Sequence, residues 1–258
     1  MMAAREGSLA EVVWHDAECG GYSADLGLWE ELAEAAAGPV LDLGCGTGRV
    51  ALHLARRGHE VVAVDREPAL IDELGARAVG VPAEGTVADA RNLDLGREFP
   101  LALAPMQLLQ LLADEAERRR CLEAIARHLS PGGLAALAIV EDTLGEPVSP
   151  FSRQARERRD GPPPLPDTRE VGGVVYSSLP LPTVVDDGAI LVRRLRQTVA
   201  PDGRLEEEES TIALRELSAE QLESEAGRVG LEPLPRRQIA ATADHVGSTV
   251  VVLRKGVA

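Results

Sequence analysis

The sequence predicts an α/β protein with a doubly wound, Rossmann-like sheet of seven mostly parallel strands, the last of them antiparallel. Short apolar runs, which suit strands buried on both faces, alternate with segments of helical periodicity. The first of these runs, residues 40–43, leads through glycines directly into a helical segment. That order of strand, glycine turn and helix is typical of a ligand-binding βα unit.

Composition limits the class of protein. At 258 residues the chain is long enough for one large α/β domain or for one domain with an insertion. The net charge of -15 argues against nucleic-acid and membrane partners. Three cysteines without paired spacing predict neither a disulfide framework nor a metal site. The amino terminus lacks the apolar core of a signal peptide, and no apolar run would span a bilayer, so a cytoplasmic protein is expected.

The glycine turn has a spacing of its own. A dinucleotide-binding G-x-G-x-x-G loop places its third glycine five residues after the first, where this chain has Arg49. The third glycine is Gly48, one place earlier. A close approach of helix and strand over a pyrophosphate is therefore disfavoured, and Arg49 could instead meet a carboxylate. A glycine turn that binds no ligand is the structural alternative.

The remaining elements of the core follow in alternation. Asp25 could cap a helix that runs to residue 36, and Pro68 fits the first turn of another. A helix is expected over 114–128 with His128 at its C-terminal end, where a cation is favoured. Ser218 and Gln221 form a capping-box pattern for a helix ending at Gly230. The other strands are expected at residues 59–65, 84–89, 99–104, 134–140, 231–239 and 248–253.

Between the fifth and sixth strands the α/β alternation breaks. Four arginines (153, 156, 158 and 159) cluster in an irregular stretch, which could bind an anion or be a solvated loop. Residues 174–179, 190–199 and 205–214 then alternate apolar and polar side chains, separated by Asp-Gly turn signals. We interpret residues 145–215 as an inserted antiparallel sheet that caps the cleft. The chain thus reads as one domain, 1–258, with residues 22–140 as its core.

Acidic residues end two of the strands. Asp65 lies nineteen residues after Gly46, where a carboxylate can accept hydrogen bonds from ribose hydroxyls. Asp89 ends the next strand. With the glycine loop and the turn Ser130–Gly133, this series resembles the class I S-adenosylmethionine-dependent methyltransferases, although that family usually has an acidic residue near Pro100.

The resemblance implies S-adenosyl-L-methionine as cofactor and S-adenosyl-L-homocysteine as product. Backbone of the glycine loop would hold the methionyl group, Arg49 or Tyr22 its carboxylate, Asp65 the ribose and Asp89 the adenine amino group. The expected cofactor-binding residues are Tyr22, Gly44, Cys45, Gly46, Arg49, Asp65, Arg66, Asp89, Ala90, Pro105 and Met106.

The predicted reaction is in-line transfer of a methyl group to a small molecule, because alignment and exclusion of water supply most of the catalysis. A protonated acceptor needs a base, for which His15, Glu141, Tyr176 and His245 are candidates. Trp14, Gln107 and Gln110 are candidates for contact with the substrate, Trp14 as part of a lid. Two alternatives remain open: a nucleotide-dependent (NAD-type) oxidoreductase and a non-catalytic cofactor-binding protein of the same fold.

Overall fold

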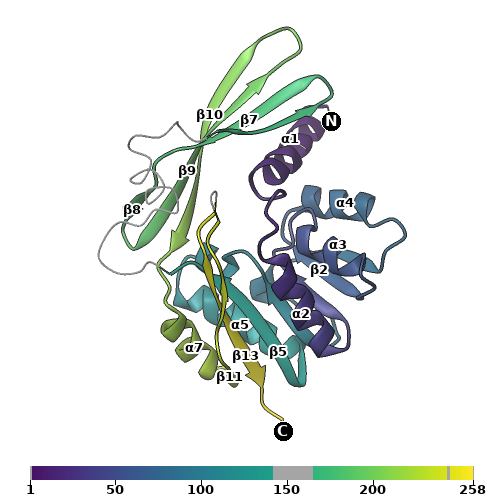
Figure 1. Ribbon diagram of the computed structural model, residues 1–258, viewed down its shortest axis with the longest axis vertical. Coiled ribbons are helices and arrows are strands. Elements are labelled where there is room, and N and C mark those ends of the chain that lie inside the picture. The colour runs from purple at the N-terminus through teal and green to yellow at the C-terminus, as the bar shows by residue number, and fades with distance from the viewer. Residues whose placement is uncertain (1, 142–164, 243–244, 258) are drawn as a thin grey trace.

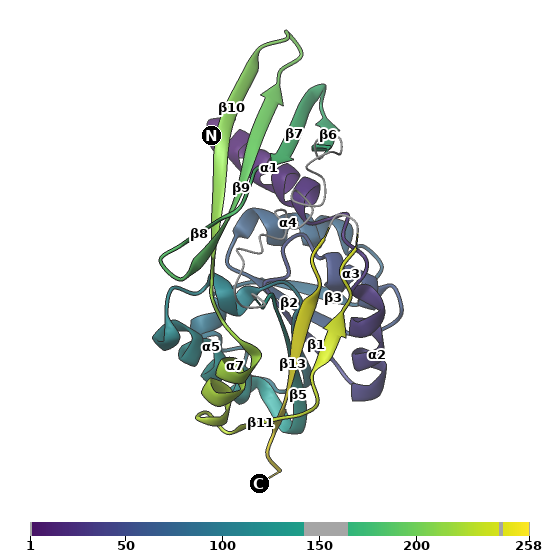
Figure 2. The same cartoon turned by 60° about the vertical axis from the view of Figure 1, so that its left-hand side comes forward.

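The computed structural model describes residues 2–141, 165–242 and 245–257 (Figure 1). Helices flank a central sheet on both faces, and a second sheet extends away from it (Figures 1 and 2). The helices are α1 (Met2–Glu18), α2 (Leu26–Ala36), α3 (Arg49–Ala55), α4 (Pro68–Arg77), α5 (Glu115–His128) and α7 (Ala219–Gly227), with short 3-10 turns at Ala90–Asn92 and Leu108–Leu111. No described helix is both long and apolar enough to cross a membrane.

The central sheet has the predicted doubly wound order. Its strands run β3-β2-β1-β4-β5-β13-β11, with β12 also paired to β13. The pairs among β1 to β5 are parallel, whereas β13 runs antiparallel to β5. The strand order reverses between β1 and β4, so ligands are expected beyond the carboxyl ends of these strands. The parallel strands are β1 (Val40–Leu43), β2 (Val61–Asp65), β3 (Ala83–Val87), β4 (Phe99–Ala104) and β5 (Leu129–Ile139).

The sixth strand predicted along the chain is divided into two short strands at the edge of the sheet. Both β11 (Leu231–Pro233) and β12 (Arg237–Ile239) pair with β13 (Ser248–Lys255), where one strand over 231–239 was predicted. Between them the Leu234 amide still donates to the Val252 oxygen at 2.8 Å, but Pro235 has no N–H to offer. The predicted fold class is confirmed, with eight strands in seven positions.

Two apolar cores pack on the two faces of this sheet. One joins α2, α3 and α4 to the sheet through Trp29, Leu54 and Leu74. The other joins α5 and α7 through Leu122 and Leu222. Both cores are mostly aliphatic, as the scarcity of aromatic residues implies. The three layers are therefore held together by the burial of aliphatic surface, with few contacts between aromatic rings.

Helix α1 is the largest departure from the sequence prediction, which places its first helix after Asp25. The helix lies between the cap and α4 (Figures 1 and 2). Val12 packs with Ala69 and Leu70 of α4, whereas Trp14 packs against Tyr176 of the cap. Because the helix buries side chains in two directions, no single apolar stripe appears in its sequence.

The second sheet is the predicted antiparallel cap, and its described part spans Asp167 to Arg215. Its order is β10-β9-β7-β6, with β8 paired to β9. At the β8–β9 turn, Asp187 and Gly188 have φ of 45° and 67°, as a two-residue hairpin requires. The strands are β6 (Asp167–Val171), β7 (Val174–Pro180), β8 (Val184–Asp186), β9 (Ala189–Val199) and β10 (Leu205–Arg215).

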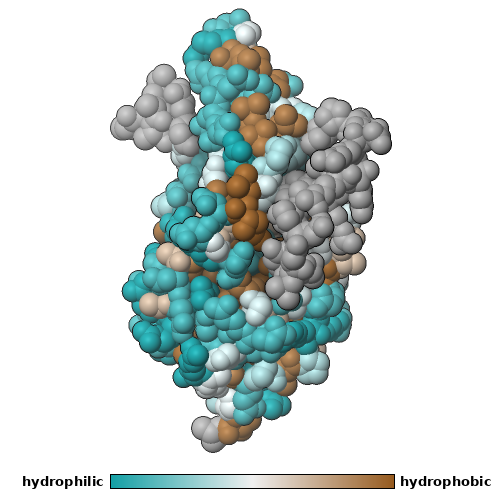
Figure 3. Space-filling view, turned by 90° about the vertical axis from the view of Figure 1, so that its left-hand side faces the viewer, coloured by the Kyte–Doolittle hydropathy of each residue, from teal (hydrophilic) through white to brown (hydrophobic). Residues whose placement is uncertain are grey.

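The sequence prediction omitted β6 and β8, and the predicted arginine cluster (residues 153–159) lies outside the described residues. Several large apolar side chains of the cap are exposed, including Val184, Leu205 and Ile212. Figure 3 shows apolar side chains gathered in a strip along this part of the molecule, flanked by hydrophilic ones.

Three local predictions need correction. Strand β3 ends at Val87, not at Asp89, because Asp89 turns the chain into the 3-10 turn that its side chain caps. The predicted turn at Ser130–Gly133 lies within β5, which has a register shift opposite β4. Helix α7 ends at Gly227, not at Gly230, although Ser218 caps its start as predicted.

His128 does end α5 as predicted, but its ring is positioned as a neutral group. Nε2 accepts from the Leu95 amide at 2.9 Å, and Nδ1 lies 2.7 Å from the Ala124 oxygen, to which it donates. One nitrogen therefore accepts while the other donates, which is the pattern of the uncharged imidazole. The cation in the last turn of this helix is Arg127.

Candidate functional site

The glycine loop connects β1 to α3 and is tied to the neighbouring strand. Gly44, Gly46 and Gly48 have φ of 69°, 56° and 92°, the left-handed region that favours glycine. The Gly44 and Cys45 amides donate to the Val64 oxygen at 2.8 and 3.0 Å. The loop therefore has a defined conformation before any ligand binds.

Asp65 holds the middle of this loop. Its carboxylate accepts from the Gly46 amide at 2.9 Å and from the Glu67 amide at 3.0 Å. The side chain lies at the carboxyl end of β2, as predicted, beside the exposed Arg66. Asp65 thus orders the loop in addition to any contact with a ribose. The spacing of nineteen residues that suggested a ligand contact also brings this carboxylate against the loop itself.

Asp42 belongs to the same site, and the sequence analysis missed it. The residue lies in β1, two places before Gly44, with 1% of its surface exposed and no hydrogen-bond partner for either carboxylate oxygen among the described residues. Burial raises the pKa of Asp42 to about 7, although the nearby Arg49 guanidinium and Ala51 amide oppose the shift. The Ala51 amide lowers this pKa without forming a hydrogen bond of good geometry. A buried carboxylate without a donor is the kind of group that a ligand completes. An acidic residue in the first apolar run was the available signal.

Arg49 has partners that the sequence did not reveal. Its guanidinium binds Asp25 through two hydrogen bonds, of 2.6 and 2.7 Å, and donates to the Tyr22 backbone oxygen at 3.0 Å. Asp25 is fully buried and also accepts from the Trp29 indole, so its side chain does not cap α2 as predicted. The Arg49 guanidinium lies 5.2 Å from the centre of the Tyr22 ring. Arg49 and Tyr22 are therefore together, as expected of two groups near one carboxylate.

The end of α1 closes over the loop. A Cβ added to Gly46 would lie 2.1 Å from His15 Nε2, so the ring covers that glycine. Thr47 donates to Asp16 at 2.7 Å, and Asp16 pairs with Arg77 of α4. Burial lowers the pKa of His15 despite the nearby Asp16, which favours the neutral ring. Of the candidate bases, His15 is the one in contact with the glycine loop.

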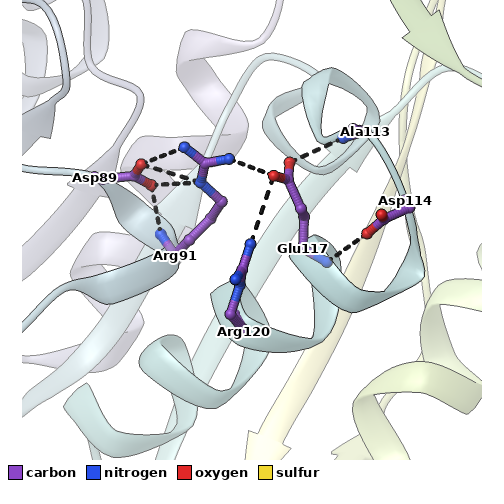
Figure 4. Close-up of polar contacts among 6 residues, drawn as sticks. All are labelled: Asp89, Arg91, Ala113, Asp114, Glu117 and Arg120. Carbon is purple, nitrogen blue, oxygen red and sulfur yellow. Dashed lines mark hydrogen bonds and ion pairs between the residues drawn. The ribbon is translucent and has the colours of Figure 1, made fainter.

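Asp89 follows β3 and forms a charged cluster with residues of α5 (Figure 4). Arg91 Nε lies 2.9 and 3.0 Å from its two carboxylate oxygens, and Arg91 also reaches Glu117 at 2.6 Å. These hydrogen bonds lower the pKa of Asp89, although burial opposes them. Asp89 is thus an ionised acceptor at neutral pH. Ala90 begins the 3-10 turn that follows it.

The loop after β4 lies across from the first glycine. A Cβ at Gly44 would be 3.4 Å from the Leu108 side chain, so the segment after Pro105 and Met106 is near the loop. Gln107 has a left-handed backbone with φ of 34°. Gln110 is fully buried, and its amide bonds Val140 and Arg215, so it serves the core and not a substrate. The predicted role of Gln110 needs this correction.

The other candidate bases lie apart from one another. Glu141 accepts from the Ala219 amide at 2.8 Å and so caps α7. Tyr176 is buried in the cap and meets the Trp14 ring edge-on at 5.2 Å. His245 stacks on Tyr22 with 4.6 Å between ring centres. The structure therefore brings His15 and His245 to residues expected to bind the cofactor, whereas Glu141 and Tyr176 have structural contacts.

The fold and this site define a class of protein: a doubly wound α/β domain with a glycine loop and acidic residues at the ends of β2 and β3. Residues 40–133 match the family described as "Methyltransferase domain". This segment of the chain is therefore similar to the class I S-adenosylmethionine-dependent methyltransferases, a family whose cofactor is S-adenosylmethionine. The resemblance stated from the sequence is confirmed.

Curated relatives match only part of the chain. The cypemycin N-terminal methyltransferase of a Streptomyces species is 38% identical over 98 residues, 38% of this chain and 40% of that protein. The ubiquinone biosynthesis O-methyltransferase of Xylella fastidiosa (strain 9a5c) is 32% identical over 108 residues, 41% of this chain and 43% of the relative. The chain thus spans less than half the length of these two relatives.

Solved structures match nearly the whole chain, at low identity. The sugar N-methyltransferase KedS8 from a Streptoalloteichus species superposes with a TM-score of 0.71 at 18% identity, covering 95% of this chain and 92% of that one. The amino pentose methyltransferase CalS10 from Micromonospora echinaspora, solved with S-adenosylmethionine bound, gives 0.67 at 19% identity over 94% and 96% of the two chains. These likenesses establish the shared fold, cap included.

Proposed function

We propose that this protein transfers the methyl group of S-adenosylmethionine to a small-molecule acceptor by in-line displacement. The single observation that carries the proposal is the charge around the glycine loop. Asp42, Asp25 and Asp65 lie within electrostatic reach of one another, with Arg49 among them. Their net charge is negative whether or not Asp42 holds its proton.

This charge distinguishes between the two cofactors considered. A nicotinamide dinucleotide would place two negative charges of its pyrophosphate at the loop, where these carboxylates repel them. S-adenosylmethionine has one more positive than negative charge, and its ammonium group is the donor that Asp42 lacks. Asp42 is buried and has no hydrogen-bond partner among the residues described, so it fits the methionyl end of this cofactor.

In this proposal, other residues bind the remaining parts of the cofactor. Asp65 accepts hydrogen bonds from the ribose, beside Arg66, and Asp89 accepts from the adenine amino group with the Ala90 backbone adjacent. Tyr22, near the Arg49 guanidinium, lies where the methionyl carboxylate would be held. When bound, the cofactor supplies an electrophilic methyl group on a good leaving group.

The protein's own contribution is then alignment and exclusion of water. Helix α1 covers the loop through His15, and the same helix carries Trp14 against the cap. Cofactor loop and cap are thereby held by one element, which supports an acceptor enclosed between them. The neighbours named as sugar and amino pentose methyltransferases support a small-molecule acceptor.

Proton removal is assigned to His15 in this proposal. Its pKa is lowered by burial, so the ring is neutral and able to accept a proton near pH 7. Glu141 is less suited because its carboxylate is engaged with the start of α7. His245, on Tyr22, is the second candidate, and it is distinguished from His15 by single alanine variants assayed over pH.

The first experiment measures thermal unfolding with S-adenosylhomocysteine, S-adenosylmethionine and NADH added separately. A ligand at one hundred times its dissociation constant stabilises the native state by about 2.7 kcal/mol. Stabilisation by the two adenosyl compounds alone is the expected result. Stabilisation by NADH alone would replace the proposal with an oxidoreductase.

A second experiment separates catalysis from binding. The full chain is incubated with methyl-labelled S-adenosylmethionine and panels of small amines, alcohols and amino sugars, and formation of S-adenosylhomocysteine is measured. Label transferred to an acceptor supports the proposed reaction. Tight cofactor binding without turnover on any panel would favour the non-catalytic alternative. A matched reaction without acceptor measures background hydrolysis.

A further inference from the structure

Asp89, whose carboxylate is proposed to bind the adenine amino group, is held in its orientation by a neighbouring side chain. Asp89 lies just beyond the end of a strand, with 34% of its side chain exposed. The Arg91 guanidinium contacts both of its oxygens, and the Arg91 amide donates to Oδ1 at 2.9 Å (Figure 4). A planar fork of this kind fixes the plane of a carboxylate as well as its position.

Arg91 is in turn held from the opposite side. Its Nη1 donates to Glu117 Oε1 at 2.6 Å, and the Arg120 guanidinium approaches the same oxygen at 3.5 Å. Charges alternate along this row from Asp89 to Arg120 (Figure 4). Each cation lies beside an acidic partner, so Arg91 has no electrostatic reason to leave Asp89 for solvent.

Glu117 is fixed by the start of α5. Its Oε2 accepts from the Ala113 amide at 3.1 Å, and its own amide donates to the Asp114 side chain at 2.8 Å. This pattern is a variant of the capping box, in which a residue of the first turn reaches back to an unpaired amide. The row therefore begins at a rigid helix end and finishes at the carboxylate of Asp89.

We propose that Arg91, anchored by Glu117, is a positioning residue that orients Asp89 toward the 6-amino group of the cofactor's adenine. This inference rests on the proposed function and goes beyond it to the choice of base. An ionised carboxylate only accepts hydrogen bonds, so it favours a purine with an amino group at position 6 over one with an oxo group. Arg91 holds the acceptor in one orientation, so less freedom is lost on binding.

The test compares two ligands on the full chain by titration calorimetry. The probes are S-adenosylhomocysteine and its 6-oxo analogue, S-inosylhomocysteine. The wild-type chain is expected to prefer the amino compound by about tenfold or more, since a hydrogen bond to a charged group is among the strong ones. Arg91→Ala is expected to reduce this preference to within about threefold, by the same reasoning.

Matched variants separate positioning from general damage. Arg120→Ala removes a cation of the same row that contacts Glu117 but not Asp89, and should retain the wild-type preference. Arg91→Lys restores the charge without the fork and should retain only part of the preference. If Arg91→Ala fails to fold, Glu117→Ala provides the second test. This variant keeps the side chains of Arg91 and Asp89 but removes the carboxylate that anchors Arg91, so the preference for the amino compound should fall.

Each result has a distinct meaning. A preference that stays at the wild-type ratio in Arg91→Ala, even with both affinities reduced, would show a merely structural role and overturn the inference. Tighter binding of S-adenosylhomocysteine in Arg91→Ala would show that Arg91 competes with adenine for Asp89, which also overturns it. Failure of the wild-type chain to bind S-adenosylhomocysteine would instead contradict the proposed function.

Discussion

Asp25 and Arg49 form a buried ion pair that ties the start of α2 to the start of α3. Two hydrogen bonds of 2.6 and 2.7 Å join the groups, and the exposed fractions of their side chains are 0% and 8%. Neither residue type nor spacing predicted this pair. The pair fixes the position of Arg49, which follows the glycine loop. The Trp29 indole also donates a hydrogen bond to the Asp25 carboxylate.

Asp25→Ala is expected to lower the free energy of unfolding by about 3 to 5 kcal/mol, because Arg49 is left buried and unpaired. Urea unfolding measures this. Glu31→Ala on the same helix breaks the exposed pair with Arg237 and should cost at most about 1 kcal/mol. Replacing both buried partners, as Asp25→Leu with Arg49→Met, should cost less than Asp25→Ala; equal costs would mean that the unpaired charge is not the cause.

Asp42 should make stability depend on pH. An ordinary aspartate ionises near pH 4, whereas Asp42 in the folded chain does so at about 7. Between these values the unfolded state has lost a proton that the folded state keeps, so the free energy of unfolding falls as pH rises from 4 to 7. Asp42→Asn should remove that fall, worth up to a few kcal/mol at about 1.4 kcal/mol for each pKa unit. Asp72→Asn, at an exposed position of α4, is the control.

The same residue should release a proton when the cofactor product binds. An ammonium group beside Asp42 favours the ionised carboxyl, so S-adenosylhomocysteine binding at pH 7 should release about half a proton. Calorimetry in two buffers of different ionisation enthalpy measures this release. Asp42→Asn should abolish it and weaken binding. Undiminished release in that variant would assign the proton to another group.

Asp65 should contribute to both stability and affinity. Asp65→Ala leaves the Gly46 and Glu67 amides without their acceptor, which costs about 1 kcal/mol for each bond. Affinity for S-adenosylhomocysteine should fall about tenfold or more through loss of the ribose contacts. Asp72→Ala should change neither quantity. If stability fell while affinity stayed unchanged, the ribose assignment would be wrong and only the loop role would remain.

Gly46 should not tolerate a side chain. Gly46→Ala combines a left-handed backbone, worth about 1 to 2 kcal/mol, with a clash against His15. Gly58→Ala has the same sign of φ with open space around its Cβ, so it measures the backbone cost alone. Adding His15→Ala to Gly46→Ala should recover the difference. Equal unfolding energies for the two single variants would contradict the position of His15 on the loop.

Much of the central sheet could be predicted from the sequence because its determinants are local. Strand β4, Phe99–Ala104, is an apolar run with the predicted bounds, and β1 is continuous with its glycine loop. Asp65 was predicted at the end of β2 because it terminates an apolar run. The break between β11 and β12 also has a local cause, which is Pro235. It was not predicted, because the apolar residues on both sides of Pro235 were interpreted as one strand.

The parts that could not be predicted depend on contacts between distant segments. Gln110 was interpreted as facing the substrate, yet it bonds Val140 and Arg215, which are 30 and 105 residues away. Helix α1 packs apolar residues against both α4 and the cap, so its sequence shows no single apolar stripe. The partner of Arg49 and the position of His15 likewise follow from where α1 and α2 pack.

The sequence by itself determined the class of this protein: its alternating apolar runs, its glycine loop and the acidic residues after β2 and β3 are short-range patterns set by backbone geometry and burial. Only the tertiary structure decided which of those groups are free to meet a ligand. Arg49 is paired with Asp25, Asp89 is held by Arg91, and Asp42 is buried with no hydrogen-bond partner in the part of the chain that the structure describes. The reason is physical, since hydrogen-bond and charge partners are chosen by proximity in space after packing, which spacing along the chain does not specify.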